Sequence, residues 1–109
     1  SGWGIYIGNE PDKPDTTITL YDLPGAEPDY AAGIEYPAIQ VRVRGAPAAY
    51  LAAYERARQV RDLLLSMHKT PLGGALYSAW METDVAHLDT DESQRPIFVA
   101  TYRLMRSEA

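Results

Sequence analysis

The sequence predicts one α+β domain in which a single long amphipathic helix packs on one face of a mostly antiparallel sheet. Several short segments alternate β-branched or aromatic residues with polar ones, and one segment of about 20 residues changes to apolar spacings of three and four. Composition agrees, because 46% apolar and 23% charged residues over 109 positions are typical of one packed domain. We therefore expect a single domain over residues 1–109, in the order β-β-β-α-β-(β)-β.

The N-terminal third contains two predicted strands and two connections. Residues 3–8 are rich in aromatic and β-branched side chains, and residues 17–22 alternate Ile18 and Leu20 with polar neighbours. The prolines of "NEPDKPD" between them exclude a helix and regular strand pairing. Pro24-Gly25 is expected to end the second strand in a turn, and residues 26–35 then read as a surface loop.

The middle of the chain gives the clearest strand and the helix. In "YPAIQVRVRG" the apolar Ile39, Val41 and Val43 are expected to face inward while Gln40, Arg42 and Arg44 face outward. From about residue 48 to about residue 68, apolar side chains recur at helical spacing: Tyr50, Tyr54, Ala57, Val60, Leu64 and Met67. The segment "KTPLGG" is expected to end this helix.

Two further strands are predicted in the C-terminal third. Residues 76–83 read as the fourth strand, and residues 96–106 as a last strand that is apolar on both faces and therefore central in the sheet. The intervening "DVAHLDTDESQR" is either a short strand over residues 84–88 with a hairpin tip or a disordered loop, and we favour the hairpin.

Two motifs look like ligand sites but lack the residues that the chemistry requires. "LYDLPG" reads like the magnesium-side strand of a GTPase, yet the chain has no glycine-rich phosphate loop with its lysine. "DTDES" groups three acids, but counted from Asp89 it offers Gln94 and Ala100 where an EF-hand needs glycine and glutamate. We interpret the first as an edge strand with its turn and the second as a solvated hairpin tip.

Composition narrows the function classes further. The chain has no cysteine, its two histidines lack metal-ligand spacing, and no serine stands in a nucleophile-elbow motif. We expect no catalytic residue, no cofactor, no metal and no membrane span, since no apolar stretch approaches the roughly 20 residues a span needs. The net charge of −5 argues against an ordinary nucleic-acid-binding protein. A small enzyme with a carboxylate pair stays open, and Asp22 beside another acid in an enclosed pocket would support it.

Basic residues fall into two sets with two possible roles. Arg42 and Arg44 share one strand face, while Arg56, Arg58 and Arg61 lie along the polar side of the helix. They either keep these faces soluble or form ion pairs with an acidic neighbour at a subunit interface, where tyrosine and arginine are enriched.

Three segments together resemble the minor capsid, or tail terminator, proteins of long-tailed bacteriophages. The resemblance rests on "YIGNEPDKPDTTITLYDLPGAEPD", on "YPAIQVRVRG", and on the helix "YLAAYERARQVRDLL" that follows. It covers about 60 residues in order, and residues beyond them match only in their strand pattern. Such proteins usually begin with a helix, which we expect to be missing from this sequence.

The resemblance implies a structural virion protein and not an enzyme. Its members form a ring, normally of six subunits, that caps the head-proximal end of the tail tube, ends tube polymerisation and joins the tail to the head connector. The implied partners are further copies of the chain, the tail tube protein, a neck or connector protein, and genomic DNA that passes without specific binding. The implied location is the head–tail junction of the virion, after assembly in the bacterial cytoplasm, and a head-side neck ring is the alternative.

The ring hypothesis assigns roles to two exposed segments. The loop at residues 26–35, with Asp29 and Tyr30, is expected to contact a neighbouring subunit, together with the Pro-Asp segment before it and the two arginine sets. Asp89, Asp91 and Glu92 are candidates for an acidic loop that faces the lumen and repels DNA phosphates.

Overall fold

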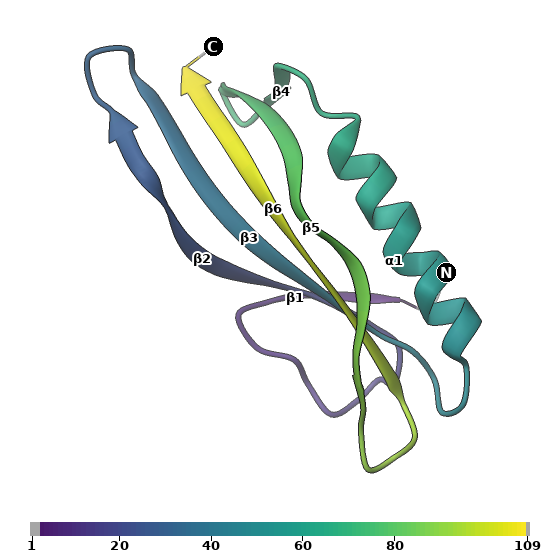
Figure 1. Ribbon diagram of the computed structural model, residues 1–109. Coiled ribbons are helices and arrows are strands. Elements are labelled where there is room, and N and C mark those ends of the chain that lie inside the picture. The colour runs from purple at the N-terminus through teal and green to yellow at the C-terminus, as the bar shows by residue number, and fades with distance from the viewer. Residues whose placement is uncertain (1–2, 109) are drawn as a thin grey trace.

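The structure is a computed structural model that describes residues 3–108, with one helix laid along a long twisted sheet (Figure 1). Its elements are β1 (Gly4–Ile7), β2 (Thr17–Asp29), β3 (Ile34–Arg44), α1 (Tyr50–Leu65), β4 (Thr70–Leu72), β5 (Ala75–Thr90) and β6 (Pro96–Glu108). The strand order in the six-stranded sheet is β1-β2-β3-β6-β5-β4. Only β1 and β2 are parallel, and the other neighbouring pairs run antiparallel. The α+β prediction is confirmed, and β6 is central as its apolar faces predicted.

Small residues let α1 approach the sheet closely. Ala53 and Ala57 are its buried residues, and the helix packs against β3, β5 and β6. Val43 of β3 and Phe98 of β6 are each 1% exposed beneath it. Burial of these side chains is the main favourable term for the domain, at about 1.5–3 kcal/mol for each large apolar side chain.

The helix is shorter at both ends than predicted, because the backbone on either side leaves the right-handed region. Ala48 has a φ of 62° and Lys69 a φ of 50°. Between the helix end and Lys69, the main-chain N–H of Ser66 donates to the oxygens of Asp62 and Leu63, which tightens the last turn. The predicted segment from about 48 to about 68 is thus α1 with two non-helical residues before it and three after it.

The predicted turn at Pro24-Gly25 and the loop over residues 26–35 are wrong. β2 continues through this dipeptide to Asp29, and the chain reverses only over residues 30–33. No strand of the described part pairs with β2 beyond Leu20 on its outer edge, so a missing proline N–H costs no ladder bond there. Gly25 is required because a Cβ at this position would collide with the main-chain oxygen of Tyr36 on β3.

Two further differences lie near the other sheet edge. The hairpin favoured over a disordered loop is confirmed, but the short strand expected at residues 84–88 is part of one long β5. This strand keeps its pairing to β6 across several register shifts. The segment expected only to end the helix also forms the edge strand β4, which turns into β5 through Gly73 and Gly74. Both glycines have positive φ, at 56° and 85°, as a tight two-residue hairpin requires.

The sheet extends well past the helix, and the molecule measures 49 × 24 × 22 Å. Figure 1 shows the β2–β3 hairpin and the β5–β6 hairpin projecting at opposite ends. Because α1 covers β3, β5 and β6, the short edge strand β1 stays uncovered, and Ile5 and Ile7 are 70% and 81% exposed.

Gly45→Ala is expected to lower the free energy of unfolding by about 1–3 kcal/mol, because the added methyl overpacks the junction between β3 and α1. Its Cβ would lie 2.7 Å from the Cβ of Ala53. Urea unfolding followed by circular dichroism measures the change. The double variant Gly45→Ala/Ala53→Gly removes the colliding methyl, so its loss should be smaller than the sum of the two single losses; strictly additive losses would contradict this packing.

Candidate assembly surface

The Pro-Asp segment, residues 8–16, is held against the sheet by a buried arginine. Arg44 is only 3% exposed, and its guanidinium points into this loop. It donates hydrogen bonds of 2.6–3.2 Å to the main-chain oxygens of Pro11, Asp12, Pro14 and Asp15, and its Nη1 lies 3.6 Å from a carboxylate oxygen of Glu10. One side chain therefore satisfies carbonyls that an irregular loop cannot pair internally.

A second buried arginine ties the same loop to the β5–β6 turn. Arg95 is 5% exposed, and its Nε donates to Asp91 at 2.8 Å. Its other nitrogens reach the carboxylates of Asp12 at 3.0 Å and Asp15 at 3.2 Å, and the main-chain oxygen of Asp12 at 2.6 Å. Two segments 80 residues apart in sequence are thus joined by one guanidinium.

The prediction that Arg44 faces outward to solvent is wrong. The Pro-Asp loop folds over that face of β3 and buries the arginine, whereas sequence alternation only reports which face a side chain occupies. Arg42, on the same face, lies outside this cluster with its guanidinium 6.0 Å from the ring centroid of Tyr21.

The pKa values of two carboxyls reflect these pairs. The hydrogen bond from Lys13 is the largest influence on Asp15 and, with the charge and hydrogen bond of Arg95, holds its pKa below the ordinary 3.8 against a smaller effect of burial. Burial raises the pKa of Asp91, but hydrogen bonds from Arg95 and Ser93 and the arginine's charge outweigh it, so this pKa is lowered too. Both groups stay ionised into moderately acidic solution.

The helix arginines do not join the strand arginines in one surface. Arg56 lies 5.2 Å from the ring centroid of Trp3, and Arg58 lies 5.7 Å from that of Tyr54. Arg61 forms ion pairs with Asp62 at 3.1 Å and with Asp84 of β5 at 3.3 Å. Arg58 is exposed, whereas Arg56 and Arg61 are half-buried, so Arg58 is the most accessible of the three predicted arginines on α1.

The projecting β2–β3 hairpin carries the two predicted contact residues at its tip. Tyr30 is 86% exposed, and Asp29 accepts a hydrogen bond of 3.1 Å from the main-chain N–H of Ala32. Beneath the turn is an open hollow of about 250 Å³, lined by Pro28, Asp29, Tyr30, Gly33, Ile34, Glu35 and Glu108. An exposed tyrosine above a partly apolar hollow is typical of a surface that meets a partner.

The acids at the β5–β6 turn divide into one structural and two open carboxylates. Asp91 accepts hydrogen bonds from the main-chain N–H groups of Ser93 and Arg95 as well as from the Arg95 side chain. Glu92 is exposed, and Asp89 is also exposed and accepts a hydrogen bond of 2.7 Å from the main-chain N–H of Thr90. All three line a shallow hollow of about 450 Å³ that also includes Asp12 and Arg95.

Arg95 and Lys69 were not singled out from the sequence, although one of them carries a readable signal. Arg95 follows Asp91 in a turn before a strand, and an Asp at such a position accepts hydrogen bonds from residues just after it. Lys69 has no such signal, since its left-handed backbone follows from the way the chain leaves α1.

No group of His, Asp and Glu side chains that could hold a metal ion occurs among residues 3–108. Asp22, the residue on which the enzyme alternative depended, is exposed in the middle of β2 opposite Ile39 and lines neither hollow. His87 packs against Phe98 and Tyr50, far along the chain from His68. Within the same described range, no helix is long and apolar enough to cross a membrane.

Comparison with protein-family models finds a match over nearly the whole chain. Residues 2–107 match the model described as bacteriophage tail terminator protein. The chain belongs to this family. The resemblance read from the sequence is therefore confirmed, and a tail terminator is a structural component of the phage virion. No curated protein matches the chain.

Arg95→Met is expected to destabilise this terminator-family domain by about 2 kcal/mol near neutral pH, because it leaves loop carbonyls and carboxylates without their donor. Both carboxyl pKa values lie below 3.8 in the folded state, so their ion pairs stabilise the fold above that pH and lose this contribution as the pH falls through the folded values. The Tm difference between wild type and Arg95→Met, measured by thermal unfolding at pH 6 and at pH 3, should therefore narrow in acid.

The matched control is Arg103→Met, which removes an exposed pair with Glu82. Its cost should stay below about 1 kcal/mol. Equal losses for the two variants would contradict the role of the buried arginine.

Proposed function

We propose that the protein assembles into a closed ring on the head-proximal end of the tail tube, ends tube polymerisation there and joins the tail to the head connector. The observation that carries this proposal is the family match over residues 2–107. Its partners are further copies of the chain, six in the ring, with the tail tube protein on one side and a neck or connector protein on the other. The mechanism is surface complementarity, with no catalytic step.

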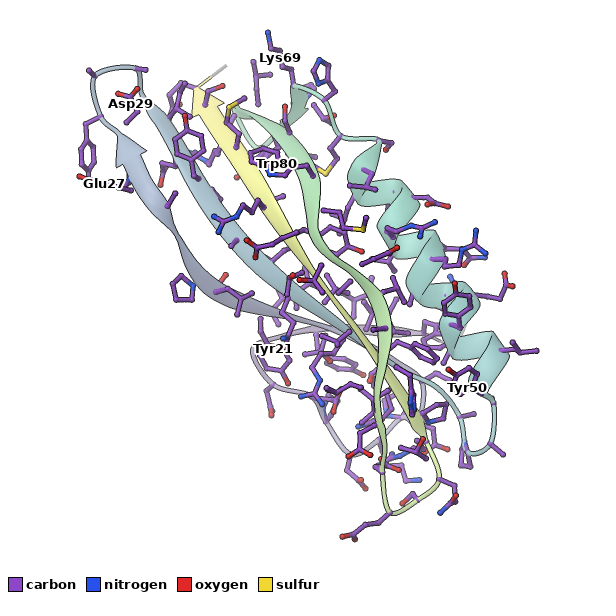
Figure 2. All side chains as sticks on the ribbon, in the orientation of Figure 1. Tyr21, Glu27, Asp29, Tyr50, Lys69 and Trp80 are labelled. Carbon is purple, nitrogen blue, oxygen red and sulfur yellow. The ribbon has the colours of Figure 1, made fainter. Side chains whose placement is uncertain are left out.

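The uncovered ends of the sheet support ring formation. A ring closes through heterologous contacts, in which one surface of a subunit meets a different surface of the next. The β2–β3 hairpin, with Asp29, lies toward one side of the sheet, and α1 lies toward the other (Figures 1 and 2). Tyr30 of this hairpin and Arg58 of α1 are both exposed. Two unlike surfaces on opposite sides are what head-to-tail contacts around a ring need.

The negative charge of the chain supports a ring whose lumen lets DNA pass without binding it. The net charge is −5, and the tip of the β5–β6 hairpin exposes Asp89 and Glu92. We propose that this tip faces the lumen, where negative charge repels phosphates. Asp91 stays with its structural role at the turn.

Deletion of the gene from the phage is expected to give overlong tails that are not joined to heads, since nothing then stops tube growth. Electron microscopy of lysates measures tail length and attachment, and supply of the intact gene from a plasmid is the control. Tails of normal length beside unattached filled heads would contradict the terminator role and support a head-side neck ring.

Asp89→Asn/Glu92→Gln is expected to slow DNA ejection and lower infectivity while leaving tail length unchanged, because the passage loses charge without losing the turn held by Asp91 and Arg95. The control is Asp22→Asn/Glu82→Gln, which removes the same charge from exposed positions on β2 and β5 away from the hairpin tip. Ejection rates measured by dye-labelled DNA release should separate the two variants. Unchanged ejection and infectivity in the hairpin variant would remove the lumen assignment.

A further inference from the structure

Lys69 occupies a strained corner and presents a free ammonium group. Its φ of 50° is in the left-handed region, where glycine or asparagine is the usual residue. The corner is fixed, because the N–H of Lys69 donates to the Oγ of buried Ser78 at 2.9 Å. Its side chain is exposed and has no ion pair or hydrogen bond to any residue between 3 and 108. A strained residue whose side chain does nothing for its own fold suggests a role outside it.

The hollow beneath the β2–β3 turn has more carboxylates than cations to pair with them. Its carboxylates come from Asp29, Glu35 and Glu108, and one cation serves two of them: Arg106 lies 2.9 Å from Glu35 and 3.5 Å from Glu108. Among residues 3–108, Asp29 meets only the main-chain N–H of Ala32. At about 250 Å³ the hollow is below the usual size of a small-molecule site, so it suits a single long side chain with a positive end.

Strand register puts the lysine corner within two residues of the row that holds the hollow, on the opposite side of the sheet. Asp29 pairs with Ile34 and Ile34 with Ser107, so this row starts at the β2–β3 turn. Ser107 pairs with Leu76 and Leu76 with Pro71, two residues after Lys69. Figure 2 shows Asp29 and Lys69 at the same end of the molecule, on different sides of the central strands. Rotation about an axis parallel to the strands would bring these two surfaces of adjacent copies together.

The sheet edges themselves favour a side-chain contact over strand addition. The unpaired part of β2 carries Pro24 and Pro28, and the edge strand β4 carries Pro71. Prolines on edge strands remove the N–H groups that a neighbouring strand would need.

We propose that Lys69 of one copy inserts into the acidic hollow beneath the β2–β3 turn of the next copy, where Asp29 accepts its ammonium. The occupant of the hollow is thus a second copy of this chain. The contact is heterologous and repeats around the ring, and it rests on the proposed ring-forming function. The left-handed backbone directs the lysine, and the hollow supplies the negative charge that the lysine lacks among residues 3–108 of its own chain.

Lys69→Glu and Asp29→Lys are each expected to disassemble the ring, because each sets like charges against each other at every interface. Size-exclusion chromatography with light scattering, and native mass spectrometry, measure the assembled fraction. We expect the half-assembly concentration to rise by about a hundredfold in each variant. An equimolar mixture of the two should assemble again, since the new glutamate fits the new lysine and the remaining wild-type surfaces fit each other.

Two control variants separate the effect of charge from an effect on folding. The possible outcomes also separate failure of the Lys69 contact from failure of the proposed ring. Lys69→Arg keeps the charge at the strained position and should stay assembled. Asp22→Lys makes the same charge change as Asp29→Lys at an exposed position in the middle of β2 that lines neither hollow, and should leave assembly unchanged. Single variants that assemble like wild type, or a mixture that stays apart, would overturn the Lys69 contact and leave the ring intact. A wild-type protein that stays monomeric at every concentration, both alone and on isolated tail tubes, would instead overturn the ring itself.

Discussion

The difference in length between the single helix and the strands of the sheet determines most of this structure. α1 has 16 residues and, at 1.5 Å per residue, spans about 24 Å. β5 also has 16 residues, but a strand rises about 3.3 Å per residue, and the molecule extends over 49 Å. The helix can therefore cover only the middle of the sheet, and both hairpins project beyond it. Surface that a domain leaves uncovered in this way is available to partners, which agrees with a structural protein of the phage tail.

Local sequence was sufficient for most of the fold. Alternation identified β3 and β6, and the change to helical spacing identified α1, because each pattern continues long enough to exclude the other. Prediction from local sequence failed where one local signal is compatible with two structures. Pro24-Gly25 is typical of a turn, but on an edge strand it is equally compatible with continued pairing on the inner side, and the choice depends on Tyr36 in the neighbouring strand. Strand β4 was missed because three residues between a helix end and a glycine pair carry no period.

The candidate site was predictable in its residue types and less so in its arrangement. Asp29 and Tyr30 were expected on an exposed segment, and they are at the tip of a hairpin. The burial of Arg44 depends on a loop 29 to 33 residues away in sequence, and no local pattern reports such a contact. The same holds for Lys69, whose significance comes from its backbone conformation and from a hollow on the opposite side of the sheet.

A cryo-EM reconstruction of the head–tail junction in the intact virion tests the central claim most directly. The account predicts a closed ring of this chain directly on the last ring of the tail tube, with the β2–β3 turn of each copy against the Lys69 corner of its neighbour. Density for this chain on the head side of the connector, or its absence from the end of the tube, would contradict the account.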